Sequence, residues 1–151
     1  MLPLLAQELS TSCVAACVRM ALASLGFALA ESDIRSRCSH SGLGMRLNQV
    51  APGLADLPVA VEYHTDWNMD DLSDAVRQSI FPIVGIDLRY IEGLFAFHAV
   101  VVANMTSEQI IVHDPLNAQT PRTISLRAFE EAREGADREC LMIEVKKGAT
   151  D

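Results

Sequence analysis

Residues 97–115 read FHAVVVANMTSEQIIVHDP, in which two apolar, β-branched runs flank a polar centre. This pattern predicts a β-hairpin. If its turn is centred on Thr106, His98 lies directly opposite Asp114, with the two Cβ atoms about 4.5–5.5 Å apart. His113 then points to the other face, because successive side chains of a strand alternate. The stretch therefore predicts an imidazole held by a carboxylate, and it selects His98 over His113.

A second strong pattern lies nearer the start of the chain and predicts a helix over 13–25. Its apolar residues recur at helical spacing, the Ser10-Thr11-Ser12 stretch offers N-cap residues, and Gly26 suits the position after the last turn. Cys13 falls in the first turn, where the helix dipole and unpaired N–H groups lower the pKa of a thiol. With His98 and its carboxylate, this thiol would complete a nucleophilic triad. Six residues upstream, the amide of Gln7 is a candidate oxyanion donor together with the backbone N–H of Cys13.

The remaining segments change from helical period to strand period along the chain. Helices first and mostly antiparallel strands later predict an α+β fold, and the absence of a linker predicts a single domain over 1–151. The other expected helices cover 31–38, 46–50, 70–78 and 125–133, and the other expected strands cover 59–63, 80–88 and 140–145.

Composition narrows the class of protein. The chain has 151 residues, of which half are apolar, and 12 basic against 20 acidic residues give a net charge of −8. Such a chain can bury one sizeable core, and its few basic residues argue against binding to nucleic acid or to an anionic membrane surface. No apolar run is long enough to span a membrane, and no signal peptide is evident, so a cytoplasmic protein is expected. Four scattered cysteines do not form a disulfide scaffold, and no cofactor or metal is implied.

The segments Gln7-x5-Cys13, His98-Ala99-Val100 and Asp114-Pro115 together resemble the papain-like cysteine peptidases of family C39. Members of this family cleave leader peptides after a double glycine in bacteriocin exporters. The resemblance covers nearly the whole chain. It implies a papain-like fold, with an N-terminal helical part carrying the cysteine and a mostly antiparallel sheet carrying the histidine and the aspartate. It also implies the roles of the four site residues: Cys13 the nucleophile, His98 the general base and acid, Asp114 the orienting carboxylate and Gln7 the oxyanion donor.

Two features depart from the exporter peptidases. These usually have Asp-Cys-Gly around the nucleophile, whereas this chain has Ser12-Cys13-Val14. The chain also ends at Asp151 with no transmembrane or nucleotide-binding domain attached, so a stand-alone C39-like domain is expected. Its expected partners are a peptide or protein substrate and an exporter or peptide precursor, while the oligomeric state is not predicted.

Other interpretations of the same residues stay open. Taken one at a time, each residue has a simpler interpretation. Cys13 is then a buried helix cysteine, His98 is a core histidine, and Asp114-Pro115 is the start of a turn. The Cys13-x3-Cys17 pair admits a metal or redox site, although core packing is the simpler interpretation of Cys17. At the level of function, the alternatives to a peptidase are a leader-binding module that does not cut, and an acyl-transfer or deamidating enzyme with the same triad.

Some residues outside this set also carry expectations. His40 and His64 are interpreted as surface residues, and Trp67 either walls a groove or covers the core. The segment 89–96 is expected as a loop that borders the substrate cleft. Cys38 and Cys140 are expected as core or surface thiols.

Overall fold

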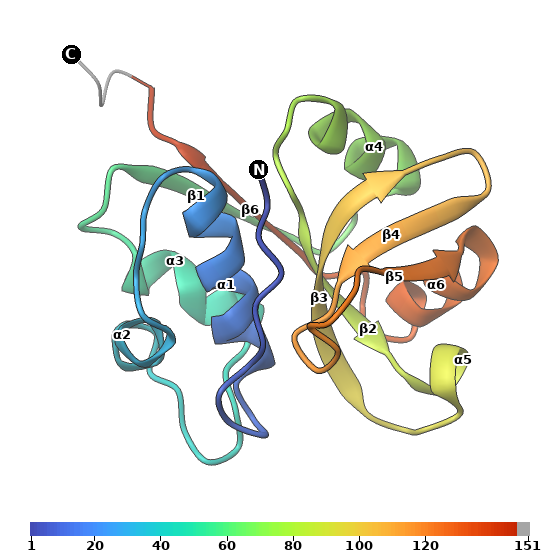
Figure 1. Cartoon of the computed structure of the whole chain (residues 1–151), viewed down its shortest axis with the longest axis horizontal. Helices are drawn as coiled ribbons and strands as arrows, with labels where there is room; N and C mark the ends of the chain where they lie inside the picture. Colours follow the sequence, from blue (N-terminus) through green and yellow to red (C-terminus); the bar gives the residue numbers. More distant parts are fainter. Residues whose placement is uncertain (148–151) are drawn as a thin grey trace.

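A computed structural model of the protein describes residues 1–147. It contains one antiparallel sheet with the strand order β1-β6-β2-β3-β4-β5 and helices on its two sides (Figure 1). This arrangement confirms the predicted α+β class. The helices are α1 (Cys13–Ser24), α2 (Glu31–Arg37), α3 (Val50–Gly53), α4 (Met69–Arg77), α5 (Arg89–Glu92) and α6 (Leu126–Glu134), and a short 3-10 helix, η1, covers Leu47–Gln49. The strands are β1 (Val59–His64), β2 (Ile83–Asp87), β3 (Phe97–Met105), β4 (Gln109–His113), β5 (Arg122–Ser125) and β6 (Cys140–Val145).

The helices form two groups around the sheet. Figure 1 shows α1, α2 and α3 together on one side, whereas α4, α5 and α6 lie around β2 to β5 on the other. Each group covers its own apolar cluster: Val101 of β3 packs in the cluster that contains α1, and its neighbours Val100 and Val102 pack in the cluster that contains Phe129 of α6. Because both faces of β3 are buried, its sequence is a continuous apolar run rather than an alternating one.

Helix α1 begins at Cys13, as predicted, and ends at Ser24, two residues before Gly26. Gly26 has a φ of +94°, and its N–H donates to the carbonyl of Ala23 at 3.0 Å, so it closes the helix in the left-handed conformation that glycine tolerates best. The predicted N-cap is only half right. Ser12 occupies the N-cap position, but its hydroxyl makes no capping hydrogen bond to α1 and interacts instead with Leu9 and Glu31.

The hairpin exists, but its predicted register is wrong. His113 pairs with Val101 rather than with Ala99, and a bulge lies between Val102 and Asn104. Strand β4 ends at His113, so Asp114 lies just past the paired region instead of directly opposite His98. The displacement is three residues between the turn and the bulge and two residues beyond the bulge. Because His98 and Asp114 lie beyond the bulge, the even displacement leaves them on one face. His98 and Asp114 therefore still meet, as a diagonal rather than a direct pair.

The other predicted elements differ from the structure mainly at their ends. Strand β6 has the predicted bounds, whereas β2 is shorter than the predicted strand over 80–88. The helix predicted over 46–50 is η1 followed by α3, and Pro52 lies inside α3, in a first turn where its missing N–H costs nothing. Helix α5 and strand β5 were not predicted. The single domain predicted over 1–151 extends into residues 148–151, which lie outside the described residues.

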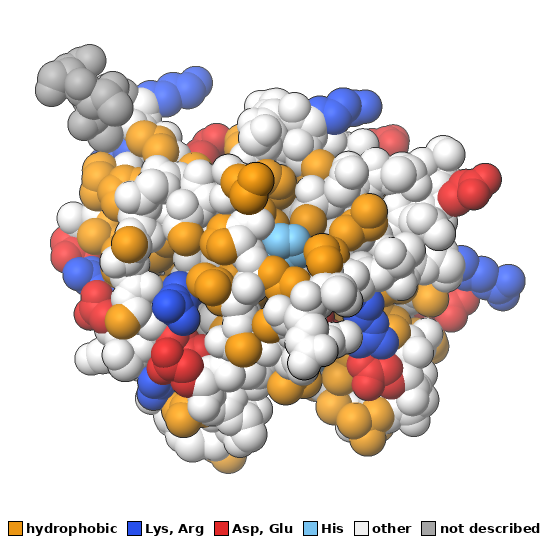
Figure 2. Space-filling model, in the orientation of Figure 1, with side chains coloured by type: hydrophobic (Ala, Val, Ile, Leu, Met, Phe, Trp, Pro, Cys, Tyr) orange, Lys and Arg blue, Asp and Glu red, His pale blue; other side chains and the backbone are white. Residues whose placement is uncertain are grey.

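Charged side chains of both signs are scattered over the face that Figure 2 shows. Figure 2 shows acidic and basic side chains next to each other at several places on one face, in keeping with ion pairs such as Arg37–Asp56 and Arg122–Glu92. Within residues 1–147, no helix is both long enough and apolar enough to cross a membrane.

Candidate active site

Cys13 lies half-buried at the N-terminal end of α1, against the start of β3. Burial by itself would raise the pKa of its thiol. The side chain of His98 and the backbone of Ala99 and Val14 stabilise the thiolate more than burial opposes it, so the pKa is lowered. A thiol with a lowered pKa that remains in part accessible is the kind of cysteine that acts as a nucleophile.

His98 and Asp114 form a buried ion pair. The Nε2 atom of His98 lies 2.6 Å from Oδ1 of Asp114, and the two residues are 6% and 2% exposed. Because this bond occupies Nε2, Nδ1 is the ring nitrogen left for the thiol. Burial alone would lower the pKa of His98, but its interactions with Asp114 and Cys13 raise it to about 9. The imidazolium form is therefore favoured next to the thiolate.

The carboxylate of Asp114 is itself held by further donors. Its Oδ1 accepts the backbone N–H of Leu116 at 2.9 Å, and its Oδ2 accepts Nη1 of Arg122 at 3.2 Å. Burial would raise the pKa of Asp114, whereas His98, Leu116 and Arg122 lower it. Arg122 lies on β5 and also pairs with Glu92 at 2.6 Å. The sequence did not indicate this arginine, because β5 is short and has no strong strand pattern; only the fold brings it to the aspartate.

Gln7 lies beside the segment that follows β4. Its backbone N–H donates to the carbonyl of Pro115 at 3.0 Å, and its side-chain Nε2 donates to the carbonyl of Leu9 at 2.7 Å. Its Oε1 atom is buried, with no hydrogen-bond partner among the described residues. An amide nitrogen carries two hydrogens, so the bond to Leu9 leaves one N–H free to donate. The structure thus places Gln7 near Asp114-Pro115, with its amide oriented by the loop that leads to Cys13.

A cleft of about 410 Å³ opens beside Cys13 and His98. Two exposed apolar side chains, Leu43 and Phe97, and two acidic residues, Asp137 and Glu139, contribute to its walls. The segment 89–96 was expected to border this cleft. None of residues 89–96 lines the cleft in the structure. The first half of this segment forms α5, and Phe97, the residue that follows the segment, is the one that reaches the cleft.

The histidines outside the site are less exposed than expected. His40 is half-buried, and its Nε2 lies 3.1 Å from Oγ1 of Thr11 and 3.2 Å from the carbonyl oxygen of the same residue. His64 is half-buried and stacks on Trp67 with ring centroids 4.7 Å apart. Trp67 packs against the apolar cluster around α6, so it does cover the core.

The other three cysteines are buried free thiols. Burial raises the pKa of Cys17 and Cys38, and it raises the pKa of Cys140 to about 12. Cys17 packs in the cluster beneath α1, as the simpler interpretation predicted. In residues 1–147, no group of three or more His, Cys, Asp or Glu side chains is arranged to hold a metal ion.

Comparison with known proteins agrees with this fold. The profile of the Peptidase C39 family matches residues 1–136. A candidate C39-like peptidase from Bacillus anthracis superposes with a TM-score of 0.82 at 14% identity, over 96% of this chain and 95% of that one. No curated protein is significantly similar to this chain.

Two further solved structures are domains of transporters. The peptidase domain of Streptococcus ComA, a bifunctional ABC transporter of a quorum-sensing pathway, has a TM-score of 0.74 at 18% identity, over 97% of this chain and 98% of that one. A double-glycine motif protease from an AMS/PCAT transporter, solved in complex with its leader peptide, has a TM-score of 0.75 at 17% identity, over 97% and 93% of the two chains. These likenesses confirm the predicted papain-like fold.

Proposed function

The chain belongs to the Peptidase C39 family, and on that premise we propose that it is a cysteine peptidase with Cys13 as nucleophile, His98 as general base and acid, and Asp114 as the carboxylate that orients His98. The observation that carries this proposal is the position of His98. Its ring interacts with the Cys13 thiol on one side and bonds to Asp114 at 2.6 Å on the other. A histidine between a thiol and a carboxylate is an arrangement that supports acyl transfer, because the histidine activates the thiol and the carboxylate orients the histidine.

In the first half of the reaction, the Cys13 thiolate attacks the carbonyl carbon of the scissile peptide bond. A C–S bond forms, and the electrons of the carbonyl double bond move to its oxygen. The Gln7 amide and the N–H of Cys13 donate to that oxyanion. His98 then gives its proton to the leaving nitrogen, the C–N bond breaks, and a thioester remains on Cys13.

In the second half, His98 accepts a proton from water while the water oxygen attacks the thioester carbonyl. The C–S bond breaks, the acid product leaves, and the thiolate–imidazolium pair is restored. The raised pKa of His98 and the lowered pKa of Cys13 support this cycle, since they favour the charged pair from which the first attack starts.

The proposed substrate is a peptide cut after Gly-Gly, such as the leader of a peptide precursor handled by an exporter. Support comes from the family and from the transporter protease that was solved with its leader peptide. The cleft beside Cys13 offers room for an extended peptide segment. We expect this activity from the single domain that the chain encodes.

Cleavage of synthetic peptides tests the proposal. Wild type should cut a Gly-Gly peptide, or a member of a peptide library, and Cys13→Ala should lose at least about 10³-fold in kcat. Cys17→Ala is the matched control, because Cys17 lies one turn further along α1 but is buried in the core. Undiminished cleavage by Cys13→Ala would contradict the proposal. Binding of the peptide without products would indicate a leader-binding module, and a change in peptide mass without fragments would indicate deamidation.

A further inference from the structure

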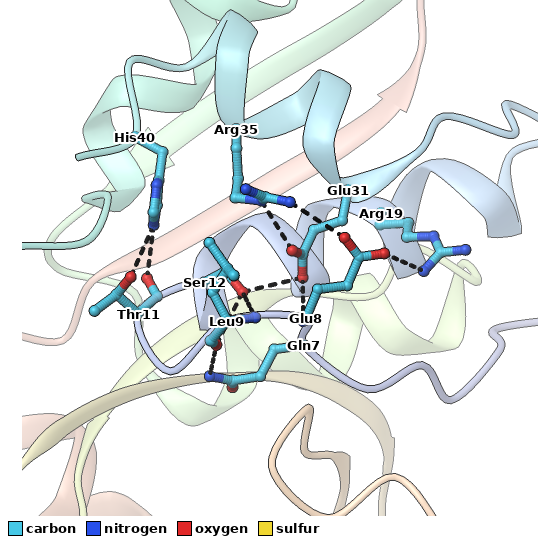
Figure 3. Close-up of polar contacts among 9 residues, drawn as sticks. All are labelled: Gln7, Glu8, Leu9, Thr11, Ser12, Arg19, Glu31, Arg35 and His40. Carbon is cyan, nitrogen blue, oxygen red and sulfur yellow. Dashed lines mark hydrogen bonds and ion pairs between the residues drawn. The ribbon is translucent and has the colours of Figure 1, made fainter. Parts of the chain in front are cut away.

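The residues between Gln7 and Cys13 form a short loop that lies on a buried carboxylate (Figure 3). This carboxylate belongs to Glu31, the first residue of α2, whose side chain is fully buried. It accepts the backbone N–H of Glu8 at 3.0 Å, the hydroxyl of Ser12 at 3.2 Å, and Nε of Arg35 at 3.0 Å. A buried carboxylate is stable only with such a set of donors, and two of the three come from the loop.

Ser12 connects Glu31 to the rest of the loop. Its Oγ accepts the N–H of Leu9 at 2.9 Å and lies 3.1 Å from the carbonyl oxygen of Leu9 and 3.2 Å from Glu31. The hydroxyl has one hydrogen, so only one of these two acceptors receives it at a time. The Leu9 carbonyl already accepts Nε2 of Gln7 at 2.7 Å and the N–H of Ser12 at 3.3 Å, which occupies both of its lone pairs. The hydroxyl hydrogen therefore goes to the carboxylate of Glu31, which is also the stronger acceptor.

Through Ser12 and Leu9, these hydrogen bonds connect Glu31 to Gln7 in the site. Because Glu31 takes the hydroxyl hydrogen of Ser12, the Leu9 carbonyl remains available to orient the amide of Gln7. We propose that Glu31 is a positioning residue, which acts through Ser12 and Leu9 to hold the Gln7 amide where an oxyanion forms. The inference rests on the proposed function, since it assigns Glu31 to the oxyanion side of that same site.

Other contacts hold the outer side of the loop and do not replace this one. Arg35 also bonds to Glu8 at 3.2 Å, and His40 holds Thr11 from the far side (Figure 3). The pKa of the Cys13 thiol is governed by burial, by His98 and by nearby backbone groups. Loss of Glu31 should therefore affect the Gln7 amide more than the thiol.

The variant Glu31→Gln tests the inference. An amide in place of the carboxylate places an NH2 group next to the N–H and O–H donors of Glu8, Ser12 or Arg35. The Ser12 hydroxyl then donates to the carbonyl of Leu9 instead, where it competes with the amide of Gln7. We expect kcat for a cleaved peptide to fall about 10- to 100-fold with KM changed by no more than about twofold. The pH profile of Cys13 alkylation by iodoacetamide should stay unchanged. The matched control is Asp33→Asn, which breaks an exposed ion pair with Arg37 on the same helix.

A double-variant cycle separates positioning from general stability. If Glu31 acts through Gln7, Glu31→Gln should reduce kcat by no more than about twofold in a Gln7→Ala background. An equal fall in both backgrounds would overturn the inference. If Glu31→Gln does not fold, Ser12→Ala tests the same connection with a smaller change. It removes the hydroxyl that accepts the Leu9 N–H at 2.9 Å, so the Leu9 carbonyl that orients Gln7 should shift, and kcat should again fall in the wild type but not in the Gln7→Ala background.

A spectroscopic measurement keeps the inference testable apart from the peptidase activity. The side-chain amide of Gln7 should give a hydrogen-bonded, slowly exchanging NMR signal in the wild type and should lose that protection in Glu31→Gln but not in Asp33→Asn. A Gln7 signal that is unchanged in Glu31→Gln would contradict the role of Glu31. A wild type that cleaves no peptide would count against the proposed function alone.

Discussion

At the scale of single residues, the reactivity of Cys13 depends on a balance between burial and His98. Burial opposes the thiolate, and the interaction with His98 reverses that effect. The same interaction contributes, with Asp114, to raising the pKa of His98 to about 9. The two groups therefore stabilise each other's charged forms. Without His98 the pKa of Cys13 should be higher, and without Cys13 the pKa of His98 should be lower.

Removal of the imidazole should make Cys13 an ordinary buried thiol. In His98→Ala, we expect the pKa of Cys13 to rise, because only the backbone of Ala99 and Val14 then opposes the effect of burial. The rate of iodoacetamide labelling at neutral pH should therefore fall. Mass spectrometry of Cys13 labelling between about pH 4 and 9 measures the inflection. His64→Ala serves as the control, because His64 stacks on Trp67. An inflection that does not move in His98→Ala would contradict the assignment of His98.

The charge of Asp114 should determine the alkaline limit of activity. Asp114→Asn keeps an acceptor for His98 but removes the negative charge that helps to raise the His98 pKa. The imidazolium should then lose its proton at lower pH, so the alkaline limb of kcat/KM should move to lower pH than in the wild type. Asp114→Ala should be more severely impaired, because it cannot orient the ring at all. The pH profile of kcat/KM for wild type, Asp114→Asn and Asp114→Ala measures these effects. An alkaline limb at the same pH in Asp114→Asn and wild type would contradict the role given to the charge of Asp114.

At the scale of elements, the end of α1 depends on the backbone conformation of one glycine. Gly26 has a φ of +94°, and a Cβ added there would meet no atom within 4 Å. Any destabilisation by Gly26→Ala therefore comes from the left-handed backbone conformation and not from a steric clash. We expect this substitution to lower the free energy of unfolding by about 1 kcal/mol.

The matched control for this helix end is Gly42→Ala. A Cβ at Gly42 also meets no atom within 4 Å, but its φ lies outside the left-handed region. Its effect should stay within about 0.5 kcal/mol. Urea unfolding of both variants gives the comparison, and equal losses would mean that the conformation of Gly26 is not the cause.

Strand β5 matters to the site because it carries Arg122. Arg122→Met removes one donor from the buried carboxylate of Asp114 and leaves the methylene stem in place. We expect the pKa of Asp114 to rise, the free energy of unfolding to fall by about 1 to 2 kcal/mol, and cleavage to slow. Arg127→Met removes a comparable ion pair on the exposed side of α6 and should be neutral. Denaturant unfolding and peptide cleavage measure both effects, and equal behaviour of the two variants would contradict the role assigned to β5.

At the scale of the whole molecule, the first residues of the chain join its two halves. Leu2 packs in the cluster beneath α1, and the carbonyl of Pro3 lies 2.8 Å from Nδ1 of His113, which is 110 positions further along. The N–H of Gln7 donates to Pro115. The N-terminal segment therefore runs between the helical part and the sheet, as Figure 1 shows, and ties both to the loop that carries Asp114.

The buried pair of His98 and Asp114 should make global stability depend on acid pH. The pKa of Asp114 is lower in the folded protein than its ordinary 3.8, so the unfolded chain binds this proton more tightly. The stabilisation is complete above that ordinary value and is lost as the pH falls through the folded value. We expect the wild type to lose more stability than Asp114→Asn when the pH is lowered from about 6 to 2. Thermal unfolding at several pH values, with Asp66→Asn as a surface control, tests this, and parallel curves for wild type and Asp114→Asn would contradict it.

Elements with strong local signals could be predicted from the sequence. The helix at Cys13 follows from apolar residues at helical spacing and from Gly26, and the hairpin that carries His98 follows from two β-branched runs around a polar turn. A turn centred on Thr106 predicts that His98 and Asp114 share a face, and they do so because the pairing beyond the bulge is displaced by an even number of residues. The α+β class follows from the order of these segments.

Features that depend on contacts between distant segments could not be predicted, because they arise only when the whole chain is folded. The register of the hairpin was wrong because the turn lies at Ser107-Glu108 rather than at Thr106, which displaces the pairing by three residues, and the bulge between Val102 and Asn104 then reduces the displacement to two. The approach of Arg122 to Asp114 and of Glu31 to Ser12 depends on how β5 and α2 pack, and nothing in their own residues specifies a partner. Local sequence sets backbone preferences and side-chain periodicity, whereas the partners of a buried charge are set by the packing of the whole chain.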